Sequence, residues 1–132
     1  MKKKLLFTAI FIGTLFSMSF VCQSDKPLVK ESDGTYVVNT SSLCKDVKGY
    51  KSNTPLKIYI KKDKVVKVEA LPNQETPKFF QRVEKSVVPS WNSKSVKSAQ
   101  KLTVDVVTGA TLSSNAVKEN MKRGLDYYMK NK

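Results

Sequence analysis

The stretch Asp105-Val106-Val107-Thr108-Gly109-Ala110-Thr111 combines hydroxyl side chains, a glycine and a small residue directly before a strong helical pattern. The first backbone N–H groups of a helix have no intrahelical partner and lie at the positive end of its dipole, so an anion such as a phosphate binds there. Gly109 can take backbone angles closed to other residues and, with the small Ala110, lets a ligand approach the main chain. Thr111 then offers a hydroxyl beside the phosphate position. From the pattern alone, an ordinary helix cap by Ser or Thr is the competing interpretation.

The order Asp-x-x-Thr-Gly-Ala-Thr resembles the flavinylation motif of the FMN-binding domain family, which includes subunits of sodium-pumping NADH:quinone reductase and Rnf-type electron-transport complexes. In that family the last threonine carries FMN through a phosphoester bond, which a separate flavin transferase installs. The resemblance implies that Thr111 is the attachment point. It implies cofactor-binding roles for Thr108, Gly109, Ala110, Ser113 and Ser114. Because a carboxylate repels a phosphate, Asp105 is expected to orient the loop or to be read by the transferase.

The resemblance extends from Gly49 to about Tyr128, because other family features follow in the usual order. Gly49-Tyr50 precedes a two-strand pattern, Glu75-Thr76 precedes a helix, and the threonine motif precedes the last helix. Two interpretations of Glu75 and Thr76 stay open: they cap the helix, or they touch the flavin. Larger relatives have a glycine-rich stretch after Glu-Thr, whereas this chain continues with Pro77-Lys78-Phe79-Phe80.

The remaining pattern predicts the elements that position these residues. Apolar and polar residues alternate on both sides of Lys62-Asp63-Lys64, which indicates a hairpin over residues 56–71. Pro77 at a first helical position starts a helix with a buried apolar stripe, and this helix is expected to end at Pro89-Ser90-Trp91-Asn92. Trp91 is expected to be a core or lid packing residue rather than a flavin stack. The β-branched run 102–107 predicts a strand that leads into the motif. The fold class expected is α+β, with a small antiparallel sheet packed against two main helices.

The N-terminus has the features of an export signal, with Lys2-Lys3-Lys4 before an apolar run that ends near Val21. A transmembrane anchor is the alternative, although the run is short and diluted by Thr, Gly and Ser. Cys22 occupies the position at which a bacterial lipoprotein is cut and lipidated, but the preceding Ser-Phe-Val fits such a site poorly. We therefore expect a signal peptide over residues 1–22, a linker or tether over 23–34 and an FMN-binding domain over 35–132.

Composition narrows the chemistry further. The sequence holds no histidine, which excludes imidazole metal sites and histidine-based triads, and no metal site is predicted. Cys44 is expected to pair with Cys22 or to be a small buried hydrophobe. The net charge of +13 comes from scattered lysines without a nucleic-acid motif, so it indicates a solvated basic surface and no nucleic-acid partner.

Together these observations predict an exported electron-transfer protein with covalent FMN, a carrier more than a stand-alone enzyme. Its partners would be a flavin transferase during maturation and redox proteins at or outside a bacterial membrane, with a lipid tether at Cys22 as an added anchor. Two alternatives remain. One is a flavin-dependent reductase of a small extracytoplasmic acceptor, and the other is a non-redox surface-binding lipoprotein.

Overall fold

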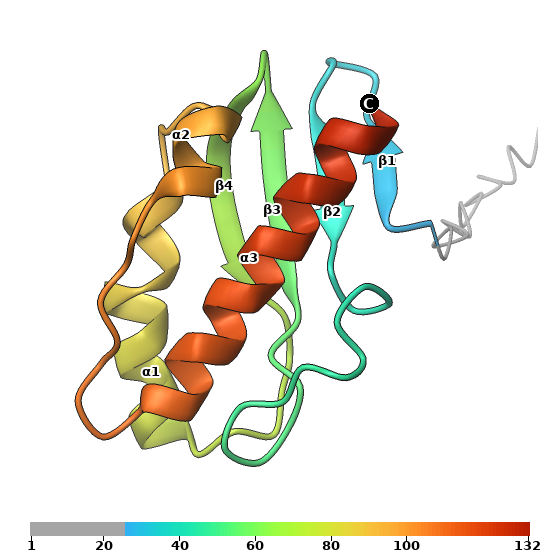
Figure 1. Ribbon diagram of the computed structural model, residues 1–132. Helices are drawn as coiled ribbons and strands as arrows, with labels where there is room; N and C mark the ends of the chain where they lie inside the picture. Colours follow the sequence, from blue (N-terminus) through green and yellow to red (C-terminus); the bar gives the residue numbers. More distant parts are fainter. Residues whose placement is uncertain (1–25) are drawn as a thin grey trace, which may run out of the picture.

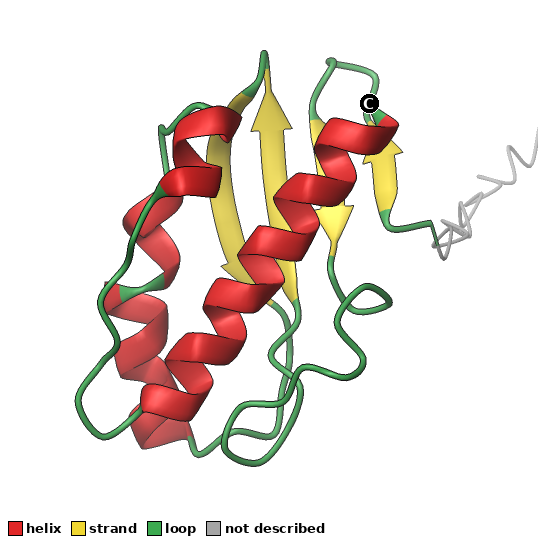
Figure 2. Cartoon of the chain, in the orientation of Figure 1, coloured by secondary structure: helices red, strands yellow, loops and turns green. Residues whose placement is uncertain are grey.

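The computed structural model describes residues 26–132, so the predicted signal segment and Cys22 lie outside the described residues. Four strands form an antiparallel sheet in chain order: β1 (Leu28–Lys30), β2 (Tyr36–Asn39), β3 (Leu56–Lys61) and β4 (Lys64–Ala70). The helices are α1 (Pro77–Ser86), the 3-10 helix η1 (Val88–Trp91), α2 (Val96–Lys101) and α3 (Thr111–Asn131). Figures 1 and 2 show the long α3 crossing the sheet, with α1 and α2 at the β4 side. The α+β prediction is thereby confirmed.

The central hairpin follows directly from its residue types. Leu56, Ile58 and Ile60 are fully buried in β3, whereas the residues between them face away from the helices. The connection is the pair Lys62-Asp63, with φ of 52° and 57°, which is the two-residue turn whose twist suits antiparallel strands. The predicted hairpin is therefore confirmed, with Lys64 as the first residue of β4 rather than the end of the turn.

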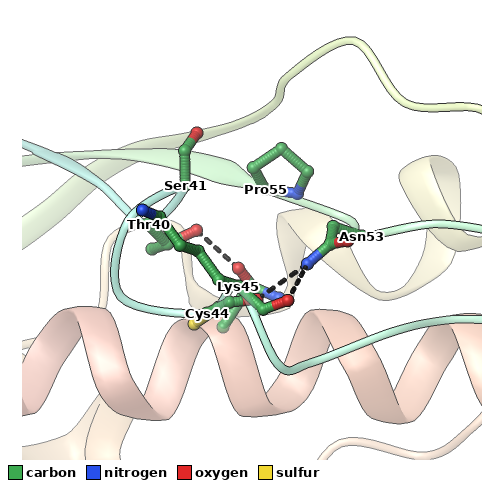
Figure 3. A pocket seen from close by; sticks show the side chains of 7 residues that line it. Thr40, Ser41, Cys44, Lys45, Asn53 and Pro55 are labelled. Atoms are coloured by element: carbon green, nitrogen blue, oxygen red, sulfur yellow. Dashed lines mark hydrogen bonds between the residues drawn. The ribbon is translucent and has the colours of Figure 1, made fainter.

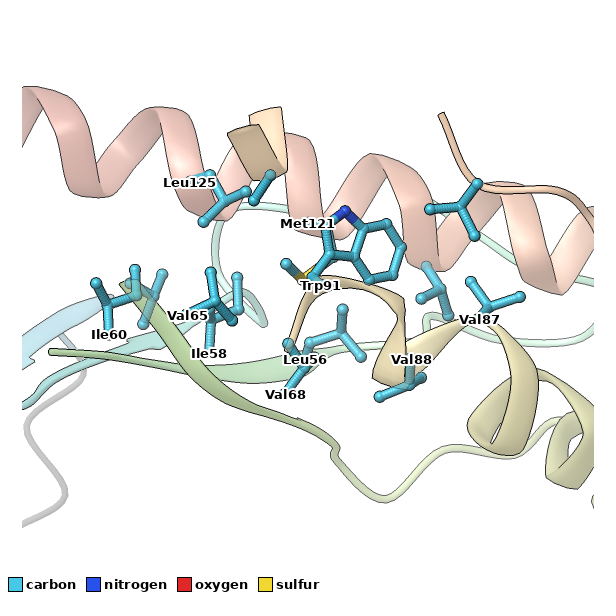
Figure 4. Close-up of a cluster of buried hydrophobic side chains, with 14 of the residues drawn as sticks. Leu56, Ile58, Ile60, Val65, Val68, Val87, Val88, Trp91, Met121 and Leu125 are labelled. Atoms are coloured by element: carbon cyan, nitrogen blue, oxygen red, sulfur yellow. The ribbon is translucent and has the colours of Figure 1, made fainter. Parts of the chain in front are cut away.

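The hydrophobic core lies between the sheet and the helices. Figure 4 shows Trp91 of η1 between the strands and α3, close to Met121. Trp91 is only 3% exposed and belongs to the main core cluster, so the prediction that it serves packing is confirmed. Burial of such apolar side chains is the largest favourable contribution to the fold.

Helix α3 approaches the sheet closely at Gly124. A Cβ atom there would lie 2.6 Å from Cδ1 of Ile58 and 3.0 Å from Cγ2 of Thr40. Thr40 is held in place because its hydroxyl donates to Asn120 Oδ1 at 2.5 Å and accepts from the Leu56 N–H at 2.9 Å. Any side chain at position 124 would therefore require Ile58 or Thr40 to move.

Two segments differ from the sequence prediction. Within the predicted linker 23–34, residues 28–30 form β1, whose Val29 pairs with Val37 of β2. The predicted strand over 102–107 is wrong: these residues are extended but join no sheet. Near the start of the β4 edge, the backbone of Val65 instead bonds with Ser93 and Lys94. We call residues 102–110 the motif strap, and Figure 1 shows it running from α2 to the start of α3.

None of the helices in residues 26–132 is long and apolar enough to cross a membrane.

Candidate functional site

The motif strap ends in a tight turn that starts α3. The turn lies at Thr108-Gly109, where Gly109 has φ of +83°, a left-handed conformation that favours glycine. Ala110, the N-cap residue, closes the turn because its N–H donates to the Val107 carbonyl at 2.9 Å. The sequence analysis foresaw this need for Gly109, and α3 begins at Thr111.

Thr111 presents a free hydroxyl at the beginning of a long helix. The residue is exposed, and its side chain makes no hydrogen bond within residues 26–132. The first bond that closes α3 runs from the Ser114 N–H to the Ala110 carbonyl, so the N–H groups of residues 111–113 remain available to a ligand. Thr108, in the preceding turn, is also exposed.

The two serines that follow have structural contacts. Ser114 is fully buried, and its hydroxyl donates to the Ala110 carbonyl at 2.7 Å and accepts from the Val107 N–H at 3.1 Å. The buried hydroxyl of Ser113 donates to Oε1 of Glu75 at 3.0 Å. Both hydroxyls therefore hold the strap and the helix start in place, whereas the sequence prediction made them neighbours of a phosphate.

Glu75 connects three segments that are distant in sequence. Its side chain is 5% exposed. Oε1 accepts from the Tyr50 N–H at 2.8 Å as well as from Ser113, and Oε2 accepts from the Lys51 N–H at 2.7 Å. These charge-assisted bonds satisfy both oxygens of the buried carboxylate. We call this arrangement the Glu75 clamp.

Gly49 makes room for the Glu75 clamp. A Cβ atom at this position would lie 1.7 Å from Oε1 of Glu75 and 3.3 Å from Cα of Ser113. From the sequence, Gly49-Tyr50 was identified only as part of the family order. The contact of Gly49 with Glu75 could not be inferred from it, because the two positions are 26 residues apart.

Neither sequence interpretation describes the Glu75-Thr76 pair fully. Thr76 occupies the N-cap position of α1, but its side chain makes no capping hydrogen bond. Glu75 does not cap α1 either, because its carboxylate bonds to the loop at Tyr50 and to α3. Whether either residue touches a flavin stays a prediction.

Exposed apolar side chains surround the end of the molecule at which Thr111 lies. Tyr50 is 69% exposed, Phe79 40% and Leu112 56%. Leu112 follows Thr111 directly, Phe79 is in the first turn of α1 after Glu75, and the backbone of Tyr50 is held by the Glu75 clamp. These three side chains form what we call the apolar rim, and an exposed apolar patch of this kind marks a binding surface.

The charges near the apolar rim are mostly positive. Lys51 and Lys78 are exposed, and the Arg82 guanidinium lies 5.9 Å from the centre of the Phe79 ring. Asp105 is the acidic residue of the motif strap and is exposed, with no hydrogen bond to the rest of residues 26–132. Together with the helix N-terminus, these cations favour a bound phosphate.

Hollows also lie elsewhere on the described part of the molecule. One, of about 570 Å³, lies between the motif strap and the segment from Ser86 to Lys94, and Asp105 lines it. Figure 3 shows another, of about 200 Å³, beneath the loop that holds Cys44. Its Asn53 amide donates to the carbonyls of Cys44 and Lys45, so this polar group is already satisfied within the protein.

Cys44 is a buried, free thiol in the structure. Burial raises its pKa to about 11, so the thiol is neutral at ordinary pH and unreactive. This agrees with the interpretation as a buried hydrophobe, while pairing with Cys22 involves a residue outside the described range. Within residues 26–132, no three Cys, Asp or Glu side chains are grouped so as to hold a metal ion.

An exposed threonine beside free helix N–H groups, cations and an apolar rim offers groups suited to a ligand with both a phosphate and an aromatic part. The chain matches the family model described as FMN-binding domain over residues 49–126. It therefore belongs to the FMN-binding domain family, as the resemblance predicted. The match contains the Glu75 clamp and the whole motif, whereas β1 and β2 precede it. Neither the curated proteins nor the solved structures gave a match to this chain.

Proposed function

We propose that this protein is an exported electron carrier that holds FMN through a phosphoester bond to the hydroxyl of Thr111. One observation carries the proposal: the Thr111 hydroxyl is exposed and unengaged at the start of α3, within a family-typical motif. Ser113 and Ser114 in the same turn are buried and bonded to the protein. Thr111 is thus the helix-start hydroxyl that an enzyme could reach.

Attachment is a phosphoryl transfer for which the chain supplies the acceptor. The Thr111 hydroxyl loses its proton and forms a P–O bond to the FMN phosphorus. In the same step, the anhydride bond of an activated flavin donor breaks and its other phosphoryl group leaves. A separate flavin transferase would supply the base and the metal for this step, because residues 26–132 hold no histidine and no metal-binding cluster.

After attachment, the residues around Thr111 would bind and orient the group. The N–H groups of residues 111–113 would face the phosphate, and the apolar rim would receive the ring system, as aromatic surfaces bury apolar ligands. When bound, FMN supplies reversible electron transfer, and the protein supplies attachment and electrostatics. Because Thr111 is exposed, the flavin ring attached to it would be accessible to the redox partner that donates electrons and to the one that accepts them.

A covalent bond fits an exported protein. Outside the cytoplasm free FMN is dilute, so a reversible site would lose its ligand by mass action, whereas an ester retains it. Export itself rests on Lys2-Lys3-Lys4 and the apolar run that follows. Redox partners at the membrane and a lipid tether at Cys22 belong to the same proposal.

The test is coexpression of the full chain with a flavin transferase, followed by intact and peptide mass spectrometry. We expect one FMN-phosphoryl group on the Thr111 peptide and none in Thr111→Ala. Thr103→Ala is the matched control, because Thr103 is an exposed threonine of the motif strap that lies outside the Asp105–Thr111 motif, and Thr111 should still be modified in it. An unmodified Thr111 peptide, or modification that survives Thr111→Ala, would refute the proposal.

A further inference from the structure

Tyr50 combines a fixed backbone with an exposed ring. Its side chain is 69% exposed, the highest value among the large apolar side chains of residues 26–132. Its N–H donates to Oε1 of Glu75, and the turn closes because the Gly49 N–H donates to the Ser52 carbonyl at 2.8 Å. The Ser52 hydroxyl in turn accepts from the Gln74 N–H at 2.9 Å. The loop is thus tied on both sides, while the ring contributes little to the core.

Forming the Glu75 clamp carries an energetic cost, which indicates that the clamp has a role in placing this loop. Burying a carboxylate requires compensation by hydrogen bonds, and a residue without a side chain is needed at Gly49 to admit the oxygen. The two backbone bonds of the clamp fix the residues at 50 and 51, and its third bond fixes Ser113. The clamp therefore sets where the backbone of Tyr50, from which the ring projects, lies relative to the first turn of α3, which also carries Thr111.

We propose that Tyr50 stacks on the ring system of the flavin attached to Thr111, and that Glu75 is the positioning residue that places Tyr50 for this contact. The inference rests on the proposed function, because it needs the flavin to be attached at Thr111. Tyr supplies a large and rigid contact surface with few rotatable bonds. Leu112, beside Thr111, and Phe79 would form the rest of the rim around the same ring.

Flavin fluorescence reports this contact directly. An excited flavin in van der Waals contact with a phenol is quenched, because an electron passes from the phenol to the flavin and then returns. Indole quenches in the same way, whereas the phenyl ring of Phe is too hard to oxidise. Substitutions at position 50 therefore separate stacking from quenching without disturbing the fold, because this side chain is exposed.

The experiment measures fluorescence intensity and lifetime per bound flavin in the full chain after coexpression with a flavin transferase. We expect weak fluorescence in the unsubstituted protein and in Tyr50→Trp, and a severalfold increase in Tyr50→Phe and Tyr50→Ala. Tyr59→Phe is the matched control, since Tyr59 is a half-buried tyrosine of β3 on the side away from the helices, and it should leave the fluorescence unchanged.

Glu75→Gln tests the positioning role. The amide keeps one acceptor oxygen but sets an NH₂ group against an N–H donor of the loop, so we expect partial recovery of fluorescence. Far-UV circular dichroism shows whether the variant is folded. Double substitution of Glu75→Gln and Tyr50→Phe should be no brighter than Tyr50→Phe alone, because Glu75 acts through Tyr50.

Two results would count against the inference, and they are distinguishable. Equal fluorescence per flavin in the unsubstituted protein, Tyr50→Phe and Tyr50→Ala, with flavin on Thr111 in all three, would overturn the stacking contact alone. Absence of flavin from Thr111 in the unsubstituted protein would refute the proposed function and, with it, this inference.

Discussion

Replacing Ser114 by Ala should destabilise the protein even when it carries no flavin. The Ser114 hydroxyl is fully buried and joins the motif strap to α3 through Val107 and Ala110. The Ala110 carbonyl keeps a partner in Ser114→Ala, because it also accepts from the N–H of residue 114 at 2.9 Å. The Val107 N–H loses its partner.

The expected loss follows from these contacts. A neutral hydrogen bond is worth about 1 kcal/mol net, and an orphaned buried donor costs roughly 1–3 kcal/mol. Val107 is half-buried, so water can reach its N–H in part and the lower end of this range applies. Alanine favours the helix over serine by about 0.5 kcal/mol, which opposes the loss. We expect the free energy of unfolding to fall by about 1 kcal/mol.

The assay is urea unfolding followed by far-UV circular dichroism, in the Thr111→Ala background that cannot be flavinylated at this position. A structural role lowers the unfolding midpoint of Ser114→Ala in this background. A role as phosphate neighbour would leave the midpoint unchanged and reduce only flavin loading on Thr111 in the parent. That second pattern would refute our interpretation of the Ser114 contacts.

Three more predictions concern the fold around the site. Gly124→Ala should be destabilised despite its helix-propensity gain of about 1 kcal/mol, because overpacking costs roughly 1–3 kcal/mol. Adding Ile58→Val to Gly124→Ala removes the obstructing Cδ1 atom and should restore stability. If urea unfolding shows that the double variant loses the sum of the two single-variant losses, this explanation is contradicted. The Tyr128 hydroxyl and a neighbouring lysine hold the pKa of Asp63 below its ordinary value of 3.8, so this contribution to stability is present above pH 3.8 and is lost as the pH falls further. In Tyr128→Phe, the free energy of unfolding should therefore fall less steeply as the pH is lowered from about 4 to 2. The same pH dependence in both proteins would show that the contact between Tyr128 and Asp63 is absent in solution. Alkylation of Cys44 by iodoacetamide at pH 8, followed on its peptide by mass spectrometry, should be slow in the native protein and fast in urea, since its pKa is raised to about 11; rapid native labelling would contradict its burial.

The hairpin and the last helix could be predicted because each has a strong local pattern. In β3 the buried residues Leu56, Ile58 and Ile60 alternate with Lys57 and Tyr59, which leaves one way for the strand to face the core. The helix pattern after Thr111 is equally regular. The turn at Thr108-Gly109 and the helix start at Thr111 also depend on neighbouring residues only, so the exposed position of Thr111 agrees with expectation.

The sequence predictions of secondary structure were wrong where pairing between distant segments determines whether a strand forms. The run 102–107 has the β-branched residues of a strand, but strand propensity has effect only where a partner edge is free. Ser93 and Lys94 bond to Val65 at the start of β4, and the strap pairs with no strand of the sheet. Leu28–Lys30 shows the opposite case, because three residues of the segment predicted to be a linker form a strand beside β2.

The contacts of Glu75 were equally inaccessible from the sequence. Its partners lie at residues 50, 51 and 113, and no periodicity links these positions. A buried carboxylate that accepts from a loop backbone leaves no local pattern, apart from a glycine that the loop does not otherwise need. The hydroxyls of Ser113 and Ser114 were assigned to a ligand for the same reason.

The packing of the first strand sets how far Thr111 stands from the N-terminal end of the described residues. Leu28 pairs with Val38, and the side chain of Val38 lies next to Gly124, which follows Thr111 by 13 residues along α3. At about 1.5 Å per residue, roughly 20 Å of helix separates these levels. If the proposed tether holds the protein at its N-terminus, a group on Thr111 is therefore separated from the level of the first strand by most of the length of this helix.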